Sequence, residues 1–126
     1  MSAPISSLME RRVWAVDMDD TVAEVESLFA RQGVSWAPVL ESKRTIVGVI
    51  SASGLLQFHA QRQDPSAVRA WQLCSYKPIT VSPDTPVSEV ARLMIDRKIH
   101  HVVVTDNEGI AGVVSSLDFV RSFVRD

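Results

Sequence analysis

The feature that most constrains the fold of this chain is an internal repeat. Aligning Met9 with Cys74, an offset of 65 residues, and reading on without a gap pairs many identical residues. These identical pairs are Val16/Val81, Asp19/Asp84, Val22/Val87, Glu24/Glu89, Val25/Val90, Leu28/Leu93 and Val39/Val104. One residue then drops out near Lys43 and Arg44, and an offset of 64 aligns Gly48 with Gly112 and Ser51 with Ser115. The chain of 126 residues is therefore two copies of one unit.

Each copy predicts secondary structure in the order β-α-β-β-α. A short apolar strand and a turn come first, followed by an amphipathic helix whose apolar residues share one face. Two further strands and a closing helix complete the copy. The predicted strands are Val13–Val16, Ala37–Leu40 and Ile46–Ile50 in the first copy, and Ile79–Val81, His101–Thr105 and Ile110–Val114 in the second. This order predicts an α/β chain of the α+β kind, in which two small sheets, each with helices on one side, cover each other's apolar faces.

The connection between the copies contains a break in the helical pattern at Asp64-Pro65-Ser66. After this break, residues Ala67 to Cys74 are expected to form a short connecting helix with Asp64 near its cap. We interpret this segment as a linker inside one domain.

Composition and charge exclude several classes of protein. With 46% apolar and 22% charged residues, the chain is expected to be an ordinary soluble domain. Its net charge of −2 gives no overall attraction to nucleic acid or to an anionic membrane, and no apolar run is long enough to span a bilayer. The single cysteine, Cys74, cannot form an internal disulfide, and the N-terminus carries no apolar signal core. We therefore expect a cytoplasmic protein.

The repeat resembles the CBS motif family, which is named after cystathionine β-synthase and also seen in the gamma subunit of AMP-activated kinase. The resemblance runs from about Ser6 to Phe123 and is carried by the element order and by the segments "SPDTPVSEVARLM", "WAPVLE" and "GVVSSLDFV". It implies a Bateman module with motif 1 at 6–63, a connecting segment at 64–75 and motif 2 at 76–126. In this family two motifs pack sheet to sheet, and the pairs commonly form homodimers. Their ligands contain adenosine (AMP, ADP, ATP, NAD(H) or S-adenosylmethionine) and lie in clefts between the motifs.

The segment from Gly112 to Asp118 matches the family pattern of glycine, two apolar residues, Ser or Thr, any two residues and Asp. The resemblance implies that Ser115, Ser116 and Asp118 lie at a strand-to-helix turn, where the carboxylate accepts hydrogen bonds from the ribose hydroxyls. A carboxylate suits a vicinal diol because it only accepts hydrogen bonds. Ser115 and Asp118 are also spaced as a helix capping box, which needs no ligand. Both interpretations remain open.

The first copy departs from this pattern because Gly54 stands where the carboxylate is expected. One ligand site per chain, governed by the second copy, is therefore expected. The resemblance further implies that the backbone of Pro78, Ile79 and Thr80 frames an adenine and that His100 or His101 faces the phosphates. Neighbouring strand residues point to opposite faces, so we expect no metal to be held by the two histidines.

The leading functional hypothesis is a regulatory module that binds an adenosine-containing nucleotide. The alternative is a ligand-free dimerisation or protein-interaction module, which the defective first copy favours. An enzyme is a third possibility. It is the weakest, because the sequence contains no nucleophile elbow, phosphate-binding loop or metal-ligand cluster.

Overall fold

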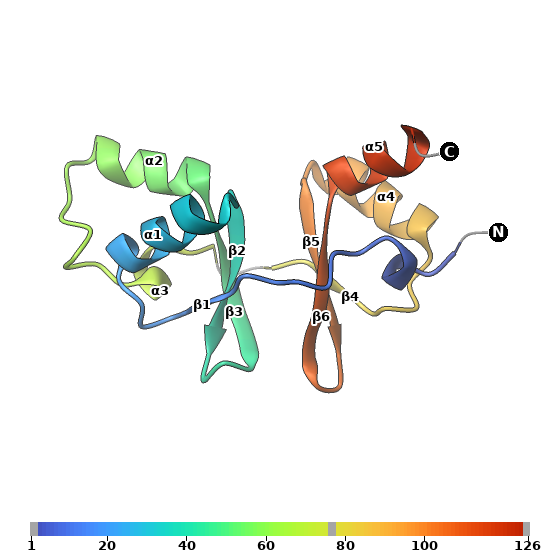
Figure 1. Ribbon diagram of the computed structural model, residues 1–126, viewed down its shortest axis with the longest axis horizontal. Coiled ribbons are helices and arrows are strands. Elements are labelled where there is room, and N and C mark those ends of the chain that lie inside the picture. Colours follow the sequence, from blue (N-terminus) through green and yellow to red (C-terminus); the bar gives the residue numbers. More distant parts are fainter. Residues whose placement is uncertain (1–2, 76–77, 125–126) are drawn as a thin grey trace. The chain divides into compact units, whose positions relative to one another are not determined.

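The computed structural model describes residues 3–75 and 78–124, which fold as two compact units (Figure 1). The first unit is Trp14–Pro78, and the second unit combines Met1–Val13 with Ile79–Asp126. The elements of the first unit are β1 (Val16–Asp17), α1 (Val22–Gln32), β2 (Trp36–Glu41), β3 (Thr45–Ser51), α2 (Ala52–Ala60) and α3 (Ala70–Leu73). Those of the second unit are a short 3-10 helix η1 (Ile5–Ser7), β4 (Thr80–Val81), α4 (Val87–Arg97), β5 (His101–Asp106), β6 (Gly109–Ser115) and α5 (Ser116–Val124).

Each unit contains a three-stranded sheet with helices on one side of it, α1 and α2 in the first unit and α4 and α5 in the second (Figure 1). The short first strand runs parallel to the second, which pairs antiparallel with the third, and both hairpins shift register at the same aligned position. The predicted β-α-β-β-α order and the α+β class are confirmed. The first strand was placed too early in the sequence, because pairing of β1 with β2 begins only at Val16.

The two equivalent helices begin with different caps. The Thr21 hydroxyl accepts a hydrogen bond from the Glu24 backbone N–H at 3.1 Å, and the Glu24 carboxylate accepts one from the Thr21 N–H at 2.9 Å, which is a complete capping box. Helix α4 has Pro86 at the corresponding position, with no side-chain cap. Both helices also receive a backbone cap, because Val22 N–H donates to the Val68 carbonyl and Val87 N–H to the Ala3 carbonyl, each at 2.8 Å. Helix α4 therefore depends more than α1 on its backbone cap, which Ala3 of the N-terminal segment provides.

Each copy is preceded by a short segment that pairs with the sheet of the other copy, and we call these two segments the exchanged segments. Ser75 leads into the second copy, yet it pairs with Val49 of β3 through two backbone hydrogen bonds of 2.8 and 2.9 Å. Glu10 leads into the first copy, yet it pairs with Val113 of β6 through two bonds of the same lengths. Glu10 and Ser75 are themselves aligned in the repeat. Each compact unit is therefore completed by a strand-like segment from the other copy.

Each unit has its own apolar core. Val22, Val25, Val39 and Phe58 of the first copy are at most 2% exposed, and Ala70 and Cys74 from the connecting segment complete the same cluster. Its counterpart contains Val90, Val102, Val104 and Val114, and Ile5 from the N-terminal segment is fully buried there. Burial of the exchanged segments is what makes the exchange stable.

The connecting segment differs in detail from the expectation. Helix α3 covers only Ala70–Leu73, and its N-cap position is Arg69 rather than Asp64. The Asp64 carboxylate instead accepts a hydrogen bond from the Ser66 N–H at 2.9 Å, which closes a turn. The prediction of a helix capped by Asp64 was wrong because this aspartate satisfies the backbone of the turn beside Pro65.

Candidate functional site

The candidate site is the corner where β6 ends and α5 begins. The Ser115 backbone N–H and hydroxyl both donate to Oδ2 of Asp118, at 2.8 and 3.2 Å. In return, the Asp118 N–H approaches the Ser115 hydroxyl oxygen at 3.4 Å. These contacts form a capping box, so the capping interpretation of the spacing is confirmed. Ribose binding by Asp118 stays a prediction.

The cap uses only one oxygen of the Asp118 carboxylate. The other, Oδ1, lies 3.6 Å from a guanidinium nitrogen of Arg121, one helical turn further along α5. The Asp118 side chain is 17% exposed, whereas the Arg121 side chain is 70% exposed. The corner therefore presents one carboxylate oxygen whose present partner is an exposed surface cation. The sequence reasoning missed Arg121, although its spacing of three residues from Asp118 on a helix was a usable signal.

The two histidines lie at the same corner. His101 is the cross-strand neighbour of Ser115, so their side chains lie on the same face of the sheet. The backbone carbonyl of His100 accepts a hydrogen bond from the Ser116 N–H at 2.9 Å. Four of the predicted residues, together with Asp118, are therefore brought together by one strand pair and the helix that follows it.

The pKa of the half-buried His101 side chain is lowered, mainly because burial disfavours the charged imidazolium. The neighbouring His100 lowers the pKa further, while the Asp118 carboxylate acts in the opposite direction. The imidazole of His101 is therefore largely neutral near pH 7, which leaves it able both to donate and to accept a hydrogen bond.

His101 should make the stability of the fold depend on pH. The unfolded chain binds the His101 proton near its ordinary pKa of about 6.5, and the folded chain binds it at lower pH, so protonation favours unfolding. The free energy of unfolding should therefore decrease as the pH falls below about 6.5. Urea unfolding of the wild type and of His101→Gln at about pH 7.5 and about pH 5.5 tests this expectation. The variant should lose less stability than the wild type over this interval, and an equal loss would show that His101 makes no contribution.

The predicted adenine-framing residues are divided between the two units. Thr80 is exposed and pairs with Val103 of β5, and the Ile79 carbonyl accepts a hydrogen bond from the Val103 N–H at 3.1 Å. The parallel pairing of β4 and β5 brings Ile79 and Thr80 to the same end of the sheet as His101. The Ile79 side chain packs against the core, so it is not available to a ligand. Pro78 belongs to the first unit.

The equivalent corner of the first unit has the same backbone without the carboxylate. Ser51 caps α2 by accepting a hydrogen bond from the Gly54 N–H at 3.2 Å, and Ala52 N–H donates to the Ser35 carbonyl at 2.8 Å. Trp36 stands in the cross-strand position that His101 occupies in the second unit. A Cβ atom added to Gly54 would meet only the Ser51 hydroxyl, at 3.6 Å, so there is room for the missing side chain. The carboxylate and the two histidines are therefore specific to the second corner.

Over residues 3–75 and 78–124, no group of three or more His, Cys, Asp or Glu side chains is placed to hold a metal ion. Within the same residues no helix has the length and apolarity needed to cross a bilayer.

Comparison with known proteins identifies both copies. The family model described as "CBS domain" matches residues 5–60 and again residues 70–125. An uncharacterized protein of Methanocaldococcus jannaschii is 26% identical over 123 residues, which is 97% of this chain and 44% of that protein. A relative from Methanopyrus kandleri is 25% identical and is covered over 62% of its length. The chain thus spans roughly half the length of these relatives.

Solved structures share the fold across nearly the whole chain. An uncharacterized conserved protein from Pyrococcus horikoshii superimposes with a TM-score of 0.87 at 23% identity, covering 100% of this chain and 96% of that one. The CBS domain of a bacterial CNNM/CorC family Mg²⁺ transporter, solved in complex with ATP, superimposes with a TM-score of 0.86 at 24% identity. That alignment covers 97% of this chain and 87% of the transporter domain. At these identities the likeness establishes the fold alone.

Proposed function

This chain belongs to the CBS-domain family, with two copies of the domain, and we propose that it binds one adenosine-containing nucleotide at the corner of its second copy. A pair of CBS domains is a regulatory module, and the proposal adds the ligand class and the site. The observation that carries it is the partly buried Asp118 carboxylate, which has one oxygen fixed by the helix cap and the other facing outward toward Arg121. AMP, ADP, ATP, NAD(H) and S-adenosylmethionine are the candidate ligands, and we expect the protein to act in the cytoplasm.

The chemistry of the corner suits a ribose. Vicinal hydroxyls are two neighbouring donors, and a carboxylate oxygen held in place by a cap is an acceptor whose orientation needs no further ordering. Hydrogen bonds to a charged acceptor contribute about 1.5–3 kcal/mol, which is enough to distinguish a diol from a deoxyribose. The exposed residue Thr80 lies at the same end of the sheet as His101, where a base or a phosphate ester of the ligand would lie. The ATP complex of the bacterial transporter domain supports the nucleotide class, because that domain has the same fold.

We propose no catalytic reaction. The Ser115 hydroxyl is engaged with the Asp118 carboxylate in the helix cap, and His101 is its neighbour on the adjacent strand. A nucleophile would need its hydroxyl proton transferred to the histidine, whereas here the hydroxyl donates to a carboxylate. The residues at the corner are arranged for hydrogen bonding to a ligand rather than for attack on one.

A panel of nucleotides in a thermal-shift assay tests the proposed function. A ligand at a hundred times its dissociation constant should stabilise the fold by about 2.7 kcal/mol, which raises Tm by several degrees. Comparing AMP with deoxyadenosine monophosphate isolates the ribose, because the second compound lacks the vicinal diol. We expect a clear shift in Tm with at least one ribonucleotide and a smaller shift with its deoxy form. No shift with any nucleotide would overturn it in favour of the ligand-free alternative.

The ligand-free alternative, an interaction module, is favoured by one surface. Helix α5 exposes Leu117, Val120, Phe123 and Val124, with 52%, 52%, 79% and 75% of their surface accessible. These residues share one side of the helix, next to the buried Phe119. Such a continuous apolar face is typical of an interface. We propose that a second copy of the chain covers it, so that the protein is a homodimer.

Sedimentation velocity tests the homodimer. The mass obtained for the wild type should be about twice the chain mass of 13.9 kDa. Phe123→Asp should shift the protein toward the monomer, because it puts a charge into the proposed interface. The control is Gln57→Asp, at an exposed position of α2, which should leave the dimer intact. A wild-type monomer at high micromolar concentration, or equal behaviour of the two variants, would contradict the dimer.

A further inference from the structure

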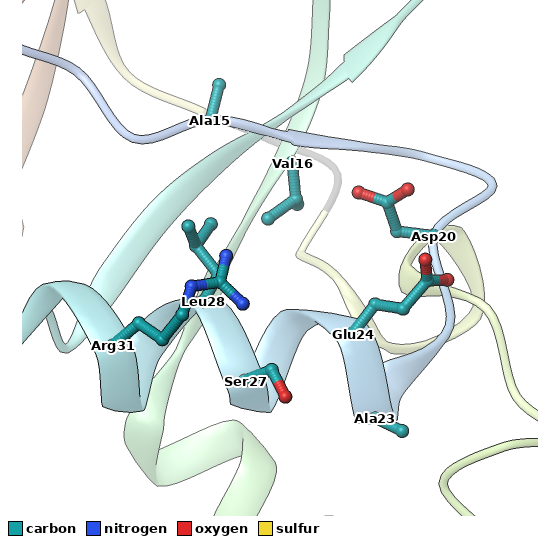
Figure 2. A pocket seen from close by; sticks show the side chains of 8 residues that line it. All are labelled: Ala15, Val16, Asp20, Ala23, Glu24, Ser27, Leu28 and Arg31. Atoms are coloured by element: carbon teal, nitrogen blue, oxygen red, sulfur yellow. The ribbon is translucent and has the colours of Figure 1, made fainter.

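A hollow in the first unit is lined by residues other than those of the candidate site. It is an open depression of about 480 Å³ between β1 and α1 (Figure 2). Ligand pockets in proteins typically have volumes of about 300–1,000 Å³, so a small molecule fits. All of its lining residues belong to the first unit, so the hollow is complete within one copy.

The hollow exists because its lining side chains are small. Ala15 and Ala23 line it together with Ser27. The aligned positions of the second copy carry larger side chains, namely Thr80, Ser88 and Arg92. The most voluminous of these, Arg92, replaces Ser27 in the middle of the helix. The hollow is therefore a property of the first copy and is not required by the shared fold.

The two ends of the hollow carry opposite charge. In Figure 2 the carboxylates of Asp20 and Glu24 both lie at one end, and the guanidinium of Arg31 lies beside Leu28 at the other. Glu24 and Arg31 are seven residues apart on α1, which corresponds to about 10 Å along the helix axis. The second copy has Thr85 in place of Asp20 and Asp96 in place of Arg31, so this polarity is also specific to the first copy.

The acidic end remains able to accept a cation. Glu24 Oε1 accepts hydrogen bonds from Thr21, and these bonds, backbone first, lower the pKa of Glu24, with a small contribution from Arg69 in the same direction. Oδ2 of Asp20 accepts from the Asp17 N–H at 3.0 Å. Each carboxylate thus uses one oxygen for the backbone and retains the other. Arg69 is nearby, and its guanidinium donates a hydrogen bond to the Asp19 carbonyl at 2.9 Å.

The middle of the hollow is apolar. Figure 2 shows Val16 pointing toward α1, and Leu28 lies below it. A ligand that spans the hollow therefore meets carboxylates, then hydrocarbon, then a guanidinium. Because the lining changes in this order from acidic to apolar to basic, we propose that the β1–α1 hollow binds a linear ω-amino carboxylate. Such a molecule has an ammonium group and a carboxylate at opposite ends of a methylene chain. The ammonium lies between Asp20 and Glu24, and the carboxylate lies on Arg31.

The test uses ε-aminocaproate as the probe, with hexylamine and hexanoate as two half-ligands. Titration of the isotope-labelled protein, followed by the backbone amide signals of Ala23, Ser27 and Arg31 in NMR spectra, should show saturable shifts with ε-aminocaproate. Each half-ligand should bind about ten-fold more weakly, because each lacks one charged contact. Equal binding of ε-aminocaproate and hexylamine would eliminate the role of Arg31, and no saturable shift with any of the three would overturn the proposal.

Matched variants separate this site from the nucleotide site. Arg31→Gln should reduce the affinity for ε-aminocaproate about ten-fold, and Ser27→Arg, which installs the residue of the second copy, should abolish binding by filling the hollow. Asp96→Asn, at the position aligned with Arg31, is the control and should bind like the wild type. Nucleotide-induced stabilisation should be the same in all three variants. Retained binding in Ser27→Arg would show that the probe lies elsewhere.

Discussion

Asp118→Ala should weaken nucleotide binding by roughly ten-fold to a hundred-fold, which is the effect expected on losing hydrogen bonds to a charged acceptor. The variant also removes the carboxylate half of the capping box at the start of α5. That loss should cost about 1 kcal/mol of stability by itself. Titration calorimetry gives the affinity and urea unfolding gives the stability, so the two consequences are measured separately.

Gly54→Ala is the matched control for the first copy, because the residue aligns with Asp118 and has no polar side chain to lose. Its added Cβ makes only an ordinary contact with Ser51 at 3.6 Å, so the fold should tolerate it. Replacing glycine by alanine within a helix should even stabilise the chain by about 0.5–1 kcal/mol. Nucleotide affinity should be unchanged. Equal affinity losses in the two variants would contradict a site governed by the second copy, and an unchanged affinity in Asp118→Ala would reduce that residue to a helix cap.

Gly48→Ala should be severely destabilising. A Cβ at this position would lie 2.2 Å from the Ser75 carbonyl oxygen and 2.8 Å from the Cys74 sulfur, so the exchanged segment would have to leave β3. Its departure breaks both backbone hydrogen bonds between Val49 and Ser75 and uncovers the core beside Cys74. We expect a loss of about 4 kcal/mol or more, at the upper limit of single substitutions.

The aligned glycine of the second copy, Gly112, allows the same substitution to be compared between the two copies. Gly112→Ala places a Cβ 2.8 Å from the Glu10 carbonyl oxygen and 2.8 Å from the flexible Met9 sulfur, which is a milder clash. The expected order of destabilisation in urea unfolding is therefore Gly48→Ala, then Gly112→Ala, with Gly54→Ala stabilised instead. A Gly48→Ala protein as stable as the wild type would show that the pairing of Ser75 with β3 does not stabilise the first unit.

The repeat made the elements of the fold predictable because hydrophobic periodicity is a local property. The repeat, with its offsets of 65 and then 64 residues, located the hairpin and the two long helices of each unit that the structure describes. The segment exchange was not predictable in the same way, because it depends on which sheet a short segment contacts. The signal was nevertheless present in Gly48 and Gly112, whose absent side chains make room for Ser75 and Glu10.

The candidate site was predictable only in part. The pattern from Gly112 to Asp118 located the corner, and cross-strand pairing brings His101 beside Ser115 there. The spacing of Ser115 and Asp118 could not decide between a cap and a ribose ligand, since both use the same carboxylate. The Arg121 contact depends on a side-chain rotamer, and the hollow beside α1 depends on how three small residues pack. These are features of packing that periodicity does not encode.

The central claim is that each chain binds one adenine nucleotide at the second of its two corners. The most direct measurement is isothermal titration of the wild-type protein with the ribonucleotide that raises Tm most. We expect saturable binding with one nucleotide per chain, because of the two corners only the second carries a carboxylate. Two equivalent nucleotides per chain, or no binding heat with any nucleotide of the panel, would contradict it.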